Sequence, residues 1–220
     1  MPAPVDAILS ELRRALVEVP ARLDRVALAI ARLDDEPFDD DEVEETLARW
    51  ASDARALIAG RGVATLAELL GGKLGLRGDE DEYDDPENSF LPRVLERRLG
   101  LPILLSIVYL EVARRAAVPL DGLALPGHFV VGQRQDDGAV VVIDPFAGGR
   151  VLAWPEVEAL VARAGGQLTP AHLTPASAHT IATRMLRNLL GSYRRRARLD
   201  KLRVVAQLLA AIDPSDDELN

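Results

Sequence analysis

Apolar residues in the first part of the chain recur at the spacing of an α-helix. Two runs share this pattern: Ile8, Leu12, Leu16 and Val19, then Leu23, Val26, Ile30 and Leu33. Because Pro20 lies between the runs, we predict two helices or one helix with a bend there. An acidic linker over 34–45 leads into a further predicted helix over 43–59, and a short helix over 65–70 ends at the two glycines that follow it. We expect these helices to cap the protein with a solvated acidic face.

The middle of the chain predicts two more helices. The first covers 90–99 and the second covers 102–117, with Gly100 between them. Pro102 suits the first turn of the second helix, because the N–H group that proline lacks would have no partner at that position. The face formed by Ile103 and its helical neighbours is almost wholly apolar, so we predict that this second helix is the central buried one.

After Pro119 the apolar pattern becomes that of β-strands. The segments 123–131 and 139–143 are rich in valine and leucine, and the polar loop 133–138 between them carries a hairpin turn signal. These features predict an antiparallel β-hairpin.

The last part of the chain returns to a helical pattern. We predict a helix over 154–164, a linker with two prolines over 165–175, and two helices over 176–212 with a break near 198–200. This order of elements predicts an α+β fold. We divide the chain into an N-terminal helical region, a core, a linker and a C-terminal helical hairpin, over residues 1–75, 76–165, 166–180 and 181–220 respectively.

Composition limits the chemistry of this chain. Its 220 residues carry a net charge of −9 and hold no cysteine. The missing thiols exclude disulfides, iron–sulfur and zinc–thiolate sites, and a thiol nucleophile within these residues. The negative charge argues against attraction of the whole chain to nucleic acid or to an anionic membrane. We expect no cofactor or metal.

We expect a cytoplasmic protein without a membrane segment. The first residues show no basic region that leads into an apolar stretch, as a secretory signal would. The longest uncharged stretch in the middle of the chain, 99–110, is shorter than the roughly 20 residues that span a bilayer.

Charge is divided unevenly along the sequence. Residues 34–87 hold 18 acidic and five basic side chains, whereas 184–203 hold eight basic and one acidic. We expect the run Arg194-Arg195-Arg196 to be a solvated turn. The alternatives are docking onto an acidic partner and contact with the acidic N-terminal region of the same chain.

His128 is the histidine most suited to chemistry, because it follows a Pro-Gly turn that includes Gly127, at the edge of an apolar strand. If the hairpin closes symmetrically, residues whose numbers sum to roughly 272 or 273 face one another, which places His128 opposite Asp144 or Pro145. Facing side chains lie about 5 Å apart, so a carboxylate could hold the imidazole in one tautomer. The pair is then either the base and orienting group of a catalytic triad or a hydrogen bond that closes the end of the sheet.

A nucleophile is missing from the expected place, the start of the central helix. Ser106 is the first candidate, and it lies four residues, or about 6 Å, beyond Pro102 along the helix axis. A serine in a buried helix more often bonds back to the carbonyl four residues earlier, which is the alternative we expect here. His172 and His179 have no acidic partner nearby in the sequence, and we expect no functional role for them.

Residues 83–150 resemble the bacterial transglutaminase-like proteins of the SirB type. The matching segments are Tyr-Asp-Asp-Pro-Glu-Asn-Ser-Phe-Leu (83–91), Val-Leu-Glu-Arg-Arg-Leu-Gly-Leu-Pro-Ile (94–103), Leu-Ser-Ile-Val-Tyr-Leu-Glu-Val-Ala (105–113), Leu-Pro-Gly-His-Phe (125–129) and Ile-Asp-Pro-Phe-Ala-Gly-Gly (143–149). The resemblance implies a papain-like, transglutaminase-core fold, with a central helix packed on an antiparallel sheet. In the thiol enzymes of this superfamily a Gly-x-Cys begins the central helix. Gly100-Leu101-Pro102 takes that place here, while His128 and Asp144 keep the other two.

The C-terminal residues 183–216 resemble one tetratricopeptide unit. Leu189, Tyr193 and Pro214 stand at matching positions, and Leu202 departs from the small residue expected there. Because a solenoid needs about three repeats, we expect this unit to pack against the core or to offer a groove to a partner.

Further motif residues are assigned to the cleft that the resemblance implies, or to its surroundings. We expect Asn88 and Ser89 to cap the helix that follows them. Glu111 would be costly to bury without a partner such as Arg97 or Arg98. The full set of cleft residues is Asn88, Arg97, Gly100, Pro102, Tyr109, Glu111 and Gly127. Gly148-Gly149 is expected to be a turn with positive φ rather than a phosphate cradle.

Together these features predict a transglutaminase-like protein that lacks its nucleophilic cysteine and binds a protein or peptide through the cleft. The alternative is a hydrolase or acyltransferase that uses His128 and Asp144 with Ser106 or with an activated water. A third hypothesis is nucleic-acid binding by the arginine-rich C-terminal helices.

Overall fold

The computed structural model describes residues 4–58 and 63–213. Its N-terminal part consists of α1 (Val5–Leu16), α2 (Leu23–Ala31) and α3 (Asp40–Ile58). The predicted separation at Pro20 is confirmed, because the residues between α1 and α2 are not helical. Helix α3 begins earlier than predicted: Asp40, Asp41 and Glu42 form its first turn, where the helix dipole favours negative charge.

The next segment differs from the predicted short helix. Helix α4 (Ala64–Ala67) continues directly into a π-helix, η1 (Glu68–Lys73), so the helix does not end at Gly71. The backbone of Gly71 packs against the carbonyl oxygen of Gly148, and a Cβ at Gly71 would lie 1.8 Å from that oxygen. Only glycine permits this close approach. The contact holds η1 against the turn of Gly148, which follows β5 (Val140–Asp144).

A two-stranded parallel sheet follows, formed by β1 (Arg77–Gly78) and β2 (Leu99–Gly100). Between these strands lie a 3-10 helix, η2 (Pro86–Ser89), and α5 (Leu91–Arg97). The helix predicted over 90–99 is therefore shorter than expected. It ends because Arg98 adopts the left-handed conformation, with φ of 63°.

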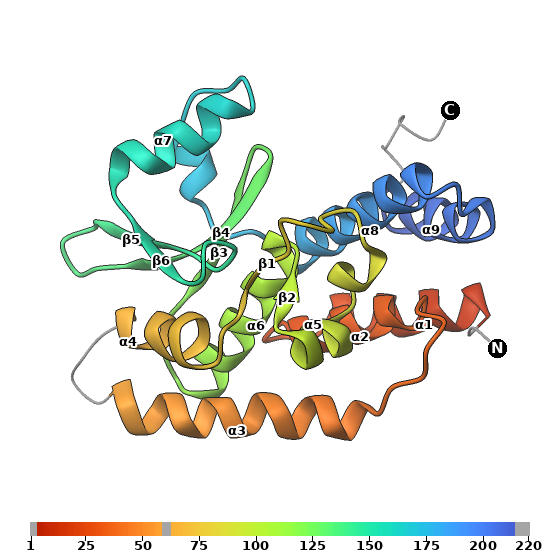
Figure 1. Ribbon diagram of the computed structural model, residues 1–220, viewed down its shortest axis with the longest axis horizontal. Coiled ribbons are helices and arrows are strands. Elements are labelled where there is room, and N and C mark those ends of the chain that lie inside the picture. Colours follow the sequence, from red (N-terminus) through yellow and green to blue (C-terminus); the bar gives the residue numbers. More distant parts are fainter. Residues whose placement is uncertain (1–3, 59–62, 214–220) are drawn as a thin grey trace.

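Helix α6 (Pro102–Arg115) is the central buried helix, as predicted. All twelve of its residues from Pro102 to Ala113 are buried, and Pro102 occupies the first turn. Figure 1 shows α6 in the middle of the molecule, with the sheet and α7 (Trp154–Arg163) towards one end. Helices α1, α2, α8 (Ala178–Arg195) and α9 (Leu199–Ile212) lie towards the other end. Helix α3 runs along one side.

The larger sheet has four antiparallel strands in the order of the sequence: β3 (Asp121–Leu125), β4 (His128–Arg134), β5 (Val140–Asp144) and β6 (Arg150–Leu152). The prediction of one strand over 123–131 is wrong. Pro126 and Gly127 reverse the chain, with Gly127 at φ 67°, and the segment folds into β3 and the start of β4. A proline followed by a residue with positive φ is the usual sequence of a tight turn.

The two faces of this sheet pack on different helices. Phe129, Val131 and Ile143 belong to the main core with α6. Val130 and Val142 point the other way and form a smaller cluster with Val157 and Val161 of α7 and with other sheet residues. The alternation of faces explains why the strands are apolar throughout rather than at every second residue.

The C-terminal helices are α8 (Ala178–Arg195) and α9 (Leu199–Ile212), which pack against each other. The linker before them holds a short 3-10 helix, η3 (Pro170–Leu173). Leu189 and Tyr193 of the predicted tetratricopeptide unit are buried in the main core, and Pro214 lies outside the described residues. One core cluster includes residues from α1 to α9, and the predicted domain boundaries remain predictions.

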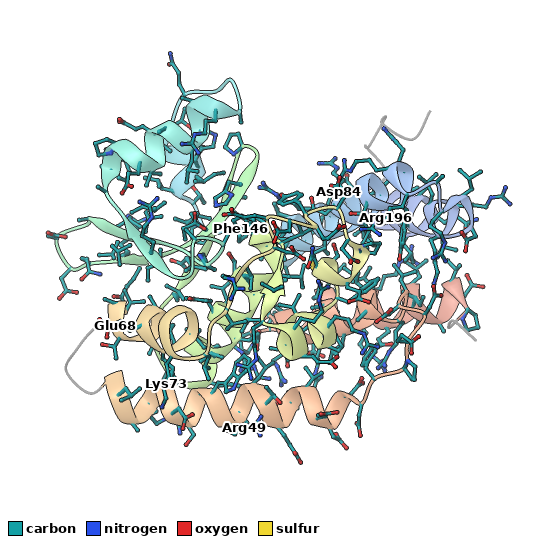
Figure 2. All side chains as sticks on the ribbon, viewed as in Figure 1. Arg49, Glu68, Lys73, Asp84, Phe146 and Arg196 are labelled. Atoms are coloured by element: carbon teal, nitrogen blue, oxygen red, sulfur yellow. The ribbon has the colours of Figure 1, made fainter. Side chains whose placement is uncertain are left out.

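The arginines at the end of α8 contact the acidic N-terminal half of the chain. Arg195 forms an ion pair with Asp84 at 2.5 Å, and Arg196 forms one with Glu82 at 3.1 Å. Figure 2 shows Asp84 and Arg196 close together at this contact. For the run 194–196, the structure therefore contains the contact with the acidic region of the same chain, which was one of the alternatives to a solvated turn. Within the described segments, no helix combines the length and the apolar character needed to cross a bilayer.

Candidate functional site

His128 and Asp144 meet at one end of the larger sheet. His128 is the first residue of β4 and Asp144 is the last of β5, and 3.0 Å separates His128 Nε2 from Asp144 Oδ2. Both side chains are largely buried, with exposed fractions of 14% and 7%. The register differs from the predicted one: Val131 pairs with Ile143, so the numbers of paired residues sum to 274. His128 therefore lies diagonally from Asp144 on the same face of the sheet, still within reach of its long side chain.

The Asp144 carboxylate is fixed by the turn that follows it. Its Oδ1 accepts hydrogen bonds from the backbone N–H groups of Phe146 (3.0 Å) and Ala147 (3.3 Å), and its main-chain oxygen accepts one from Gly149 (2.9 Å). Such turns are typical of aspartate, whose short side chain bonds to the backbone two residues on. In the neutral imidazole that donates from Nε2 to this carboxylate, the other ring nitrogen of His128, Nδ1, carries a lone pair.

The side chain of Tyr109 packs against this turn at Gly149. It is a fully buried residue of α6, and a Cβ at Gly149 would lie 2.6 Å from its hydroxyl oxygen. Gly149 itself has φ of 81°, as predicted for this Gly-Gly pair. Burial and the nearby charge of Asp144 raise the pKa of Tyr109 far above its usual range, so the phenol stays neutral.

Two aromatic rings form a wall beside the imidazole. The Phe146 ring lies edge-on to His128, with 6.0 Å between ring centroids, and Tyr83 packs edge-on against Phe146 at 5.9 Å. Phe146 packs over Gly78, where a Cβ would approach the ring to 2.4 Å. In Figure 2, Phe146 lies where the sheet meets the helical part of the molecule. The sequence analysis did not single out either ring.

Arg184 is a second residue that the sequence analysis missed. It projects from α8, donates a hydrogen bond to the carbonyl of Leu125 (2.8 Å), and lies 5.6 Å from the centroid of the Phe129 ring. Burial lowers the pKa of its guanidinium group, and the nearby Tyr83 acts in the opposite direction. No carboxylate of the described residues forms an ion pair with it. Nothing in the sequence distinguishes this arginine from its neighbours, because a missing partner is a property of the folded chain.

The start of α6 carries no nucleophile. Pro102 occupies the first turn and is buried, and the residues around it are apolar. Ser106 is fully buried, and its hydroxyl donates to the carbonyl of Phe129 (3.5 Å). The prediction that it bonds back to the carbonyl of Pro102 is wrong. A serine with no exposed surface cannot meet a substrate, so the geometry does not join Ser106 to the His128–Asp144 pair as a triad.

Glu111 and Arg97 do not pair with each other. Glu111 accepts hydrogen bonds from the backbone N–H of Leu23 (2.9 Å) and from Arg114 and Arg115, so the predicted partners Arg97 and Arg98 are wrong. Arg97 instead binds Asp79 and Glu87, each at 3.0 Å. The true partners of Glu111 lie on its own helix and at the start of α2, which places Glu111 in a structural network rather than in the cleft.

Asn88 is buried ahead of α5 and does not cap it. Its side-chain nitrogen donates to the carbonyl of Glu82 (2.8 Å), and Phe90 occupies the N-cap position without a side-chain bond. The capping prediction is wrong because Asn88 and Ser89 belong to η2. The main-chain carbonyl of Asn88 accepts a hydrogen bond from the backbone N–H of Leu101 (3.1 Å), and this bond anchors the segment that enters α6. Gly100 in that segment packs on Val94, where a Cβ would lie 2.8 Å from the side chain.

Two hollows flank the aromatic wall. One, of about 140 Å³, is lined by Tyr83, by Leu101 and by residues of α8 that include Asn188 and Arg195. The other, of about 460 Å³, lies on the far side of Phe146 and is lined by residues 77–81, 99 and 146–148. The two hollows reach the rings of the wall, Tyr83 on one side and Phe146 on the other, and neither is lined by His128 or Pro102 themselves.

Comparison with known proteins gives a consistent result. A family model described as the Transglutaminase-like superfamily matches residues 5–187. A UPF0162 protein of Xylella fastidiosa is 42% identical over 162 residues, covering 71% of this chain and 57% of that protein. A UPF0162 protein of Pseudomonas aeruginosa is 39% identical over 118 residues, covering 52% and 42% of the two chains.

The human F-box only protein 21 also matches, at 32% identity over 129 residues, which cover 56% of this chain and 20% of that protein. No solved structure matches the chain. The chain spans just over half the length of the Xylella relative, 57%. The family model covers most of the chain, including α6, the sheet and the residues of the site, and the chain therefore belongs to the transglutaminase-like superfamily.

Proposed function

We propose that this protein is a non-catalytic member of its superfamily that binds an acidic peptide segment in the cleft around His128. We place it in the SirB type, with a papain-like core and a tetratricopeptide-like unit formed by α8 and α9. The observation that carries the proposal is a fixed His128–Asp144 pair without a nucleophile, beside Arg184, to which residues 4–58 and 63–213 offer no carboxylate partner.

The absence of a nucleophile rests on three observations. The chain holds no cysteine, and the position that matches the catalytic cysteine by resemblance is Pro102. Proline offers no atom for covalent catalysis. Ser106 is buried and its hydroxyl is bonded to the backbone of Phe129. Acyl transfer through a covalent intermediate is therefore not supported.

The same side chains are suited to binding. The guanidinium group of Arg184 retains donors beyond the one that Leu125 accepts. Because this group is partly removed from water, a carboxylate that reached it would form a strong, charge-assisted hydrogen bond. The rings of Tyr83 and Phe146 offer apolar surface beside it, and His128 Nδ1 offers an acceptor. A peptide fits this combination when a carboxylate of an aspartate, a glutamate or the C-terminus accepts from Arg184 and a backbone N–H donates to His128 Nδ1.

The hollows support a peptide rather than a compact ligand. They lie on the two sides of the aromatic wall, one against α8 and one against β1. An extended chain that crosses the wall could place its acidic residue on the α8 side and a neutral or basic residue in the other hollow, which Asp79, Glu80 and Asp81 line. Helix α8 would then supply both Arg184 and one side of the groove, which gives the C-terminal helices a direct part in binding.

The test is a panel of immobilised peptides that are acidic, neutral or basic but otherwise matched. We expect the acidic peptides to be retained and to be recovered intact by mass spectrometry. Arg184→Gln should abolish this preference, whereas Arg194→Gln, at an exposed position of the same helix, should preserve it. Equal retention of all three classes would refute the ligand class.

A second candidate function is hydrolysis by a water activated at His128. The observation that favours it is the engaged Nε2, which leaves Nδ1 to accept a proton from water while Asp144 holds the ring. Purified protein would be assayed with amide, ester and amine-acceptor substrates. Turnover that disappears in His128→Ala would overturn the non-catalytic proposal in favour of this one.

The nucleic-acid hypothesis has less support than either. Arg195, Arg196 and Arg198 all form ion pairs within the chain, with Asp84, Glu82 and Asp35 respectively. Arginines that are neutralised by neighbouring carboxylates contribute little to phosphate binding.

A further inference from the structure

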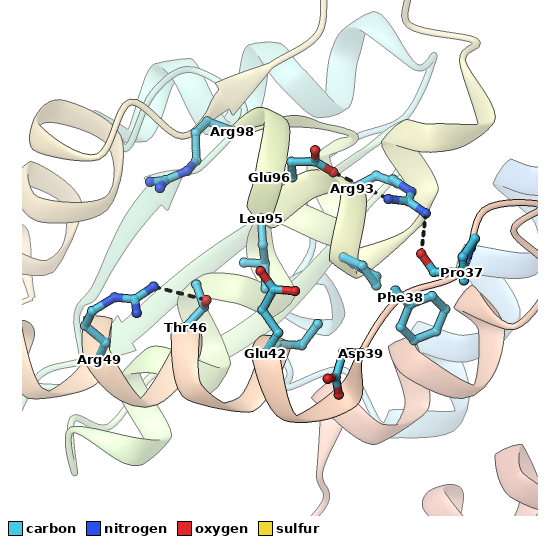
Figure 3. A pocket seen from close by; sticks show the side chains of 12 residues that line it. Pro37, Phe38, Asp39, Glu42, Thr46, Arg49, Arg93, Leu95, Glu96 and Arg98 are labelled. Carbon is cyan, nitrogen blue, oxygen red and sulfur yellow. Dashed lines mark hydrogen bonds and ion pairs between the residues drawn. The ribbon is translucent and has the colours of Figure 1, made fainter.

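A hollow of about 430 Å³ lies between α3 and α5, away from the His128 site (Figure 3). Its apolar floor includes the buried side chains of Val43 and Leu95, and Phe38 lies at one end. Charged side chains surround this floor. No residue of the His128 site lines this hollow.

The charges around the hollow are separated by sign. In Figure 3 the guanidinium groups of Arg49 and Arg98 lie at one end, whereas Glu42 and Asp39 lie towards the other. A third arginine, Arg93, is already neutralised, since it forms ion pairs with Asp34 and Glu96.

Arg49 and Arg98 lack such partners. Arg49 donates to the hydroxyl of Thr46 (3.1 Å), and Arg98 donates to the carbonyl of Leu74 (3.3 Å). Within residues 4–58 and 63–213, no carboxylate forms an ion pair with either. Each guanidinium group has five N–H donors, so most of them remain available to a ligand.

Arg98 occupies a backbone position that usually belongs to glycine. It is the C-cap of α5 with φ of 63°, a conformation that disfavours a side chain with a Cβ. Its guanidinium group is held over the indole of Trp50, 4.6 Å from the ring centroid. Arg49 and Arg98 line the same end of the hollow, and burial together with the charge of Arg49 lowers the pKa of Arg98.

We propose that Arg49 and Arg98 together bind the phosphate group of a small phosphorylated molecule, whose organic part lies on the apolar floor of the hollow. A phosphate group carries close to two negative charges at neutral pH and so neutralises both guanidinium groups, whereas a carboxylate neutralises one. Thr46 lies beside Arg49 and offers a hydroxyl donor. The carboxylates of Glu42 and Asp39 repel an anion from the other end, so the ligand has one orientation.

Trp50 provides the readout, because Arg98 lies on its ring. The chain has two tryptophans, so Trp154→Phe leaves Trp50 as the only one. In this background, inorganic phosphate and phenyl phosphate would each be titrated while Trp50 fluorescence is recorded, with sodium chloride at matched ionic strength as the control. We expect a saturable change with both phosphates and none with chloride. Tighter binding of phenyl phosphate would identify an organic phosphate as the ligand, and equal binding would identify the free anion.

Two variants test the arginines. Arg49→Gln removes an exposed charge, and Arg98→Gly removes the other guanidinium group while relieving the left-handed backbone, so that the fold is retained. Measured by titration calorimetry, which does not depend on the contact between Arg98 and Trp50, each should weaken phosphate binding at least tenfold, whereas the exposed control Arg194→Gln should leave it unchanged. The proposal is overturned if phosphate gives no saturable change, if chloride gives the same change, or if both variants bind as tightly as the parent.

Discussion

Arginine side chains are buried or partly buried at two sites in this protein. At one site they form ion pairs with carboxylates, and at the other no described carboxylate is paired with the guanidinium group. Around Glu111, every charge has an opposite partner: Arg114 and Arg115 bind the Glu111 carboxylate, and Arg115 and Arg22 bind Asp24 at 2.7 Å each. Around Arg184, the guanidinium group has a carbonyl and an aromatic ring as neighbours and no described carboxylate. The first site, which we call the closed network, joins α2, α3 and α6. The second, which we call the open site because its cation has no described anion, lies between α8 and the sheet.

Whether a buried charge has an opposite partner distinguishes a site that stabilises the fold from a site that is suited to binding. Burial raises the pKa of Asp24, but the hydrogen bonds and charges of Arg22 and Arg115 outweigh burial and hold that pKa well below its usual range. Such a network does not favour ligand binding, because its arginines and carboxylates already pair with one another. A partly buried cation without an anion reduces stability unless a ligand completes it, and we therefore assign the first site to the fold and the second to binding.

The largest expected effect follows from breaking the closed network. Glu111→Ala leaves Arg114, Arg115 and the N–H of Leu23 without their shared acceptor. We expect the free energy of unfolding to fall by about 3–5 kcal/mol, measured by urea denaturation. The exposed Glu158→Ala on α7 is the control, and it should change this free energy by less than about 0.5 kcal/mol. A similar small loss in Glu111→Ala would show that the network is not structural.

The closed network also predicts a pH dependence. Because the pKa of Asp24 is lower in the folded than in the unfolded protein, its ionised form stabilises the fold above the unfolded value of 3.8. That contribution is lost as the pH falls through the range below about 5. We expect Asp24→Asn to be less stable than the parent at neutral pH and to show a shallower decline in acid, in urea denaturation at several pH values. Parallel curves for the two proteins would contradict the assignment.

The open site should respond differently to loss of its arginine. Arg184→Gln removes one hydrogen bond to a carbonyl together with an uncompensated charge, so the free energy of unfolding should change by less than about 1 kcal/mol. Binding of an acidic peptide should weaken by about ten- to a hundredfold, as expected for a charge-assisted bond. A large loss of stability without a loss of binding would reverse the two assignments.

The smallest expected effect is at Tyr109. Its hydroxyl is buried without a hydrogen-bond partner in the described structure. Tyr109→Phe should therefore leave the free energy of unfolding within about 1 kcal/mol of the parent or raise it slightly. Leu105→Ala, in the same helix, should cost about 2–5 kcal/mol and serves as the positive control for thermal denaturation. A comparable loss in Tyr109→Phe would reveal an interaction of the hydroxyl with a bound water.

Local pattern predicted the elements better than it predicted their contacts. The central helix and the pairing of His128 with Asp144 followed from apolar periodicity and from the symmetry of a hairpin. The division of 123–131 into two strands did not, because apolar residues on both faces of a sheet hide the position of a turn. The Pro-Gly turn that includes Gly127 was recognised beside His128, but it was not used to divide the segment into two strands.

Long-range partners were beyond what the pattern could supply. Glu111 meets the backbone of Leu23, 88 residues earlier in the chain, and nothing local distinguishes that contact from one with Arg97. Arg184 was one basic residue among eight in its segment. Its distinctive property is the lack of a carboxylate in three dimensions, and that property emerges only once the sheet and α8 are packed together.

The most direct test of the binding site is a set of four calorimetric titrations. A peptide that contains glutamate and its matched glutamine version would each be titrated into the parent protein and into Arg184→Gln. We predict that the glutamate peptide binds the parent at least tenfold more tightly than the glutamine peptide, and that this preference disappears in the variant. Equal affinity of the parent for both peptides, or a preference that persists in Arg184→Gln, would contradict the assignment of the cleft to an acidic ligand.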